Sequence, residues 1–120
     1  MLNELSPEEF SLFIVIHMAS VDGTVHPTEL DAIRSKAAGL FPHIQSIQEK
    51  IDETQHAIAG MGKEAAEQFV DDNLKLLASL TPPQRTTLHQ FLLDIINADG
   101  KVKEDEMRTL RKLRTVLTAP

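Results

Sequence analysis

Residues 20–30 read SVDGTVHPTEL, and residues 97–107 read NADGKVKEDEM. Both segments contain Asp-Gly, a valine two residues after the glycine and a glutamate four residues beyond the valine, and 77 residues separate the two copies. A strongly apolar stretch precedes each copy and an amphipathic stretch follows it. The repeat therefore predicts one helix–turn–helix unit that occurs twice, over about residues 7–39 and 82–117.

Helix start signals and apolar spacing extend this prediction to the whole chain. Ser6-Pro7-Glu8-Glu9 and Thr81-Pro82-Pro83-Gln84 both read as capping boxes that open a helix. Apolar residues recur at helical spacing over 27–39, 44–58, 63–80 and 104–117, with a break at Gly60-Met61-Gly62, and no sustained strand alternation is present. We expect an all-α, compact bundle of six to seven helices that forms a single domain over residues 1–120. Its first helix, apolar on nearly all sides, should be central.

Composition narrows the classes of function. The chain has 120 residues and no Cys, which excludes disulfides, thiolate zinc sites and cysteine nucleophiles. Its acidic start and short apolar runs predict a cytoplasmic protein with no transmembrane segment. The net charge of −6 argues against nucleic-acid binding. Residues 101–120 are net basic and suit an acidic partner, a membrane surface or simply a helix end. We expect a protein partner; peripheral association with a membrane complex and a homodimer both stay open.

Helix-joining chemistry alone can explain the repeated turn. The glycine of each copy suits a backbone position with positive φ. Asp22 and Asp99 can accept hydrogen bonds from turn amides just before the next helix. Glu29 and Glu106 fall at the third helical position, from which a carboxylate reaches back to the amide of the N-cap residue. In this interpretation the four carboxylates only cap helices.

Calcium binding is the competing interpretation of the same turn. Asp-Gly-x5-Glu is also the second half of an EF-hand loop. The first half does not match, because the first ligand position would be Met18 in one copy and Ile95 in the other. The loss of the first carboxylate from both copies argues against calcium in EF-hand geometry.

Paired Asp-Gly-x-Val-x-x-x-Glu turns, each between an apolar and an amphipathic helix, resemble the TerB-like domain of tellurite-resistance proteins. The amino-terminal region of DjlA-type membrane co-chaperones has the same fold class. The resemblance covers about residues 6–117 and implies an all-helical module associated with stress response and tellurite resistance. It also implies a divalent metal, such as Ca²⁺, Zn²⁺ or Mn²⁺, bound by acidic residues. Carried over to this chain, those residues are Asp22, Glu29, Asp99 and Glu106.

A second polar pair stands on the two apolar helices of the repeat. His17 and Asp94 each precede the aspartate of a turn by five residues. They either form a buried hydrogen-bonded pair or belong to a metal site with Asp22 or Asp99. Phosphate-binding loops, nucleophile elbows and metalloprotease helices are missing, so we expect no catalytic residue and no enzyme. The sequence thus predicts a non-catalytic interaction module. The alternative is a purely structural scaffold or adaptor without metal, and a hydrolase would need a pocket that gathers His17 and Asp94.

Overall fold

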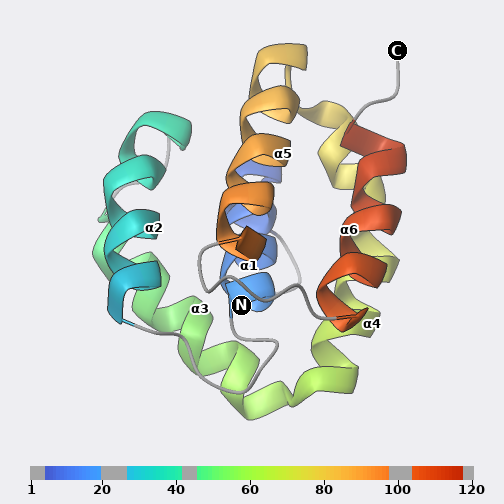
Figure 1. Cartoon of the computed structure of the whole chain (residues 1–120). Helices are drawn as coiled ribbons and strands as arrows, with labels where there is room; N and C mark the ends of the chain where they lie inside the picture. Colours follow the sequence, from blue (N-terminus) through green and yellow to red (C-terminus); the bar gives the residue numbers. More distant parts are fainter. Residues whose placement is uncertain (1–4, 20–26, 42–45, 98–103, 118–120) are drawn as a thin grey trace.

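The computed structural model describes residues 5–19, 27–41, 46–97 and 104–117. Within these ranges the chain forms six α-helices and one 3-10 helix, and no strand occurs there. The elements are α1 (Pro7–Ala19), α2 (Pro27–Leu40), α3 (Ile47–Met61), α4 (Lys63–Asn73), η2 (Leu74–Ser79), α5 (Pro82–Asn97) and α6 (Glu104–Leu117) (Figure 1). The predicted all-α fold class is confirmed.

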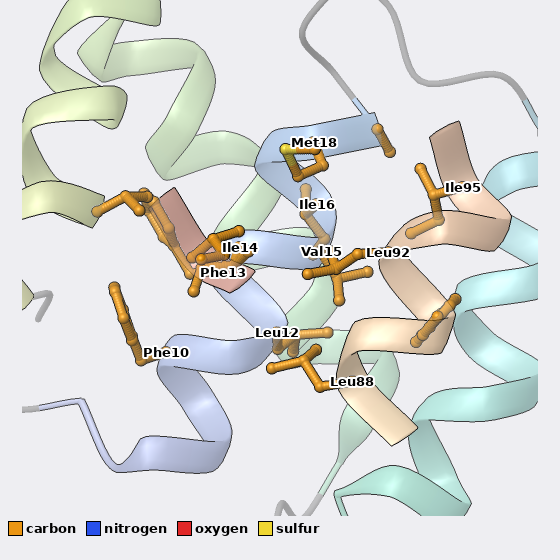
Figure 2. Close-up of a cluster of buried hydrophobic side chains, with 14 of the residues drawn as sticks. Phe10, Leu12, Phe13, Ile14, Val15, Ile16, Met18, Leu88, Leu92 and Ile95 are labelled. Carbon is orange, nitrogen blue, oxygen red and sulfur yellow. The ribbon is translucent and has the colours of Figure 1, made fainter. Parts of the chain in front are cut away.

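Helix α1 is the centre of the bundle, as its apolar sequence predicts. Every residue of α1 from Phe10 to Ala19 is buried, and the helix contacts α2, α3, α5 and η2. Figure 2 shows Leu12 of α1 beside Leu88 of α5, and Val15 beside Leu92. The buried apolar side chains form one cluster, so a helix with no polar face is covered by its neighbours on all sides.

Both predicted capping boxes are confirmed. The Ser6 amide donates to Glu9 Oε1 at 3.1 Å, and the Glu9 amide donates to Ser6 Oγ at 3.1 Å. At the start of α5, the Thr81 amide donates to Gln84 Oε1 at 3.0 Å, and the Gln84 amide donates to Thr81 Oγ1 at 3.3 Å. The Gln84 amide group also donates to Glu8 Oε1 at 3.3 Å. This bond joins the first turn of α1 to the first turn of α5.

Helices α1 and α5 run in the same direction. Their first turns are joined, and their buried side chains pair in order along both helices (Figure 2). Helix α2 contacts α1 and α6 contacts α5, and each returns toward the end where its partner helix began (Figure 1). The two hairpins of the repeat, α1–α2 and α5–α6, therefore have the same topology and the same orientation in the bundle. As a consequence, Ala19, Pro27, Asn97 and Glu104 lie toward the same end of the bundle.

The segment 63–80 differs from the single helix that its periodicity predicts. Helix α4 ends at Asn73, whose backbone leaves the helical region at φ −118° and ψ 12°, and a 3-10 helix follows. The Asn73 amide group donates to the Phe69 carbonyl at 2.8 Å, and such side-chain bonds compete with the helical ladder. After the break, η2 contacts α1, α4 and α6, and it buries Leu77. Tertiary packing of the leucines thus overrides the helical spacing of the sequence.

The predicted glycine break between the third and fourth helices is confirmed. Gly62 has φ 86°, a positive value that a side chain would strain, and its amide donates to the Ile58 carbonyl at 3.1 Å. Ile44, which the periodicity assigns to the third helix, lies outside the described residues, and α3 begins at Ile47.

Candidate functional site

The helix ends that flank the repeated acidic turns lie at one end of the bundle. Asp22 and Asp99 themselves lie outside the described residues. Glu29 is the third residue of α2 and Glu106 is the third residue of α6, as predicted, although their side chains are not among those described. The backbone therefore brings the first turns of α2 and α6, which contain Glu29 and Glu106, toward a common end of the bundle, without fixing the carboxylates themselves.

The chemistry of this donor set favours a hard cation. Four carboxylates supply oxygen atoms only, which suit Ca²⁺ or Mn²⁺, whereas Zn²⁺ favours histidine nitrogen and cysteine sulfur. Among the described side chains, no three His, Asp or Glu residues are grouped to hold a metal. A metal at this end of the bundle would therefore need side chains outside those described, among them the four predicted carboxylates.

His17 lies in the hydrophobic core and not at the surface. The residue is 2% exposed and belongs to the last turn of α1. Its ring stacks on Phe13, with the ring centroids 6.4 Å apart and an interplanar angle of 22°. The side chain of His17 is therefore part of the packing around α1.

Asp94 occupies a different environment, on the exposed side of α5. Its Oδ2 accepts a hydrogen bond from Lys36 Nζ at 2.8 Å, and its Oδ1 accepts one from the Gln90 amide group at 3.1 Å. The bond from Lys36 is the largest cause that lowers the pKa of Asp94 below its usual value. These partners engage both carboxylate oxygens, and neither is a residue that the sequence indicated.

A groove between α2 and α5 surrounds this ion pair. Its volume is about 390 Å³, and its walls include Gly39 of α2 with Thr87, Gln90 and Phe91 of α5. The Lys36 ammonium also lies 5.2 Å from the centroid of the Phe91 ring. The sequence marks Asp94 as a polar residue on an apolar helix, but no local signal connects it to Lys36, which is 58 residues away.

Other ion pairs join helices, one between α1 and α3 and one between α4 and α6. Glu9 at the start of α1 accepts a hydrogen bond from Lys50 of α3 at 2.7 Å, and this contact lowers the pKa of Glu9 and raises that of Lys50. Lys112, in the basic helix α6, lies 3.1 Å from Asp71 of α4. At least one cation of the basic carboxy-terminal helix is thus engaged by the acidic body of the same chain.

The fold defines a class of protein: an all-helical domain built from two like hairpins, in which the helix ends that flank the repeated acidic turns lie toward one end. The chain belongs to the TerB family, because the family model for "Tellurite resistance protein TerB" matches residues 9–120. Comparison with curated proteins and with solved structures gave no match. Of the helices in the described ranges, none is long and apolar enough to cross a membrane. The family match confirms the resemblance found in the sequence.

Proposed function

We propose that this chain is a non-catalytic, stress-associated interaction module of the TerB type, and that it binds a divalent cation through Asp22, Glu29, Asp99 and Glu106. The observation that supports this proposal is the common direction of the two hairpins. Because α1 and α5 are joined at their starts and packed in register, the helix ends next to both turns lie toward one end of the bundle.

In this proposal each hairpin contributes one aspartate and one glutamate. The cation supplies charge neutralisation and a link between the two hairpins when it is bound. The carboxylates provide the oxygen donors, and the packing of α1 against α5 fixes the positions of the helix ends from which the two turns start. A protein partner then recognises the module, in the cytoplasm, in the state that the cation stabilises. An ion that binds the native state and not the unfolded chain also raises the free energy of unfolding.

Isothermal titration calorimetry with Ca²⁺, Mn²⁺ and Zn²⁺ tests the metal site. We expect binding heat with Ca²⁺ or Mn²⁺, and we expect Asp22→Asn and Asp99→Asn each to remove it. Glu64→Gln is the matched control, because Glu64 is an exposed carboxylate on α4, away from both turns in sequence, and its loss should leave the heat unchanged. The absence of heat with all three ions would contradict the metal site.

The second candidate function is a scaffold or adaptor in which the carboxylates cap helices. It is supported by the two capping boxes, where Glu9 and Gln84 already stand at the third helical position. Glu29 and Glu106 stand at the same position in α2 and α6. Under this alternative, Glu29→Ala and Glu106→Ala each lower the free energy of unfolding by about 0.5–2 kcal/mol, equally in Ca²⁺ and in EDTA. A loss that appears only in Ca²⁺ would instead favour the metal site.

A further inference from the structure

In the groove between α2 and α5, the Lys36 ammonium lies between the Asp94 carboxylate and the Phe91 ring, two kinds of group that bind organic cations. The Lys36 ammonium lies 2.8 Å from a carboxylate oxygen of Asp94 and 5.2 Å from the centroid of the Phe91 ring. A carboxylate next to an aromatic face is the combination that binds ammonium groups by charge and by cation–π attraction. The side chain of Lys36 thus shows which chemistry this groove accepts.

The groove has room for a ligand beside Lys36. Its volume of about 390 Å³ lies within the range typical of small-molecule sites, roughly 300–1,000 Å³. Gly39 forms part of the α2 wall, and a Cβ at this position would meet no atom within 4 Å. A glycine inside a helix costs stability relative to alanine, and here its missing side chain leaves the groove open.

We propose that this groove is a binding site for a primary ammonium group on a short alkyl chain, and that Lys36 occupies the site as an internal competitor. The ion pair can open, because the Lys36 and Asp94 side chains are 47% and 44% exposed. A surface pair of this kind is closed for between about half and five-sixths of the time. The net charge of −6 also raises the local concentration of cations around the protein.

An NMR titration of the ¹⁵N-labelled protein with n-butylammonium tests the proposal through the backbone amides of Gln90, Phe91 and Asp94. Lys36→Ala removes the competitor and should lower the Kd by about two- to sixfold. Asp94→Asn should abolish the shifts, and n-butanol, which has the same alkyl chain without the charge, should produce none.

Lys112→Ala is the matched control. Lys112 also pairs with an exposed aspartate, Asp71 at 3.1 Å, but in the described part of the chain only the Lys36 ammonium is placed over an aromatic ring. Lys112→Ala should leave the Kd unchanged. Equal gains in Lys36→Ala and Lys112→Ala, or full binding by Asp94→Asn, would overturn the proposal, since charge alone would then explain the binding.

Gly39→Leu provides a second variant that does not alter the ion pair. Leucine is a better helix former than glycine, so the variant should fold, and its side chain should block the groove and raise the Kd. Unchanged binding in Gly39→Leu would place the ligand elsewhere and contradict the site. The source of the ammonium is distinguished with Nα-acetyl-lysine-N-methylamide. If this lysine derivative binds as tightly as n-butylammonium, the natural ligand is a lysine side chain of a partner polypeptide. If only n-butylammonium binds, the natural ligand is a small amine.

Discussion

Glu9 makes a different interaction with each of its carboxylate oxygens, so two substitutions can separate them. Oε1 accepts the Ser6 amide at 3.1 Å, and Oε2 accepts Lys50 Nζ at 2.7 Å. Glutamine can also serve at the third position of a capping box. Glu9→Gln therefore keeps the cap and removes the ion pair, whereas Glu9→Ala removes both.

The expected magnitudes follow from exposure and geometry. The Glu9 and Lys50 side chains are 26% and 24% exposed, so the pair lies near the upper end of the range for surface pairs. We expect Glu9→Gln to lower the free energy of unfolding by about 1 kcal/mol. Glu9→Ala should lower it by about 2 kcal/mol, because loss of the cap adds roughly 1 kcal/mol. Glu53→Gln is the matched control, since Glu53 is half exposed and lies 3.8 Å from the same Lys50 ammonium, and its effect should be below about 0.3 kcal/mol.

Urea unfolding followed by circular dichroism measures these differences. Lys50 lowers the pKa of Glu9 from its ordinary value of 4.5, so the ion pair stabilises the fold above pH 4.5 and is lost as pH falls through the lowered pKa. The difference between wild type and Glu9→Gln should therefore disappear at low pH. Equal losses in Glu9→Gln and Glu9→Ala, or a difference that does not vary with pH, would refute this division of roles.

Two further predictions concern backbone conformation and pH. Gly62→Ala should lower the free energy of unfolding by about 1–2 kcal/mol, because Gly62 has φ 86°. Gly60→Ala should raise the free energy of unfolding by about 0.5 kcal/mol, because Gly60 lies near the end of α3 with open space around its Cβ. Thermal melts of both variants measure this contrast. Burial, and to a lesser degree the charge of Arg114, lower the pKa of His89, so its contribution to stability is complete above pH 6.5 and is lost as pH falls through the lowered pKa. Urea unfolding between pH 5 and 7.5 should show that the free energy of unfolding depends less on pH in His89→Gln than in wild type. An unchanged pH dependence would mean that another group causes it.

The parts of the fold that could be predicted depend on local chemistry. The starts of α1 and α5 follow from capping boxes whose partners are three residues apart, at Ser6 and Thr81. The end of α4 could not be predicted in the same way. Asn73 is tolerated inside many helices, and the change to a 3-10 helix depends on how the following leucines pack against α1 and α6. Sequence periodicity alone does not contain that information.

The groove between α2 and α5 is even harder to predict from the sequence, because it depends on a contact between distant residues. The sequence marks Asp94 as a polar residue on an apolar helix, but the identity of its partner depends on how α2 packs against α5. Lys36 is 58 residues away and comes from a helix whose sequence carries no ligand-like spacing. His17 has the equivalent position in the repeat, yet it is buried because α1 is covered on all sides while α5 keeps one exposed face. Equivalent positions in a repeat thus need not have equivalent environments.

The two candidate functions differ in what balances the charge at the shared end of the bundle. The amino-terminal ends of α2 and α6 each carry about half a positive charge, which is less than four carboxylates would require if they gather there as we propose. In a scaffold, the remaining repulsion would be screened by any salt, to an extent set by the ionic strength and not by the identity of the cation. In a metal site, 1 mM CaCl₂ would raise the Tm more than NaCl of the same ionic strength, and Asp22→Asn or Asp99→Asn would remove the excess. Equal Tm shifts in the two salts would exclude a calcium site at millimolar concentration and favour helix capping.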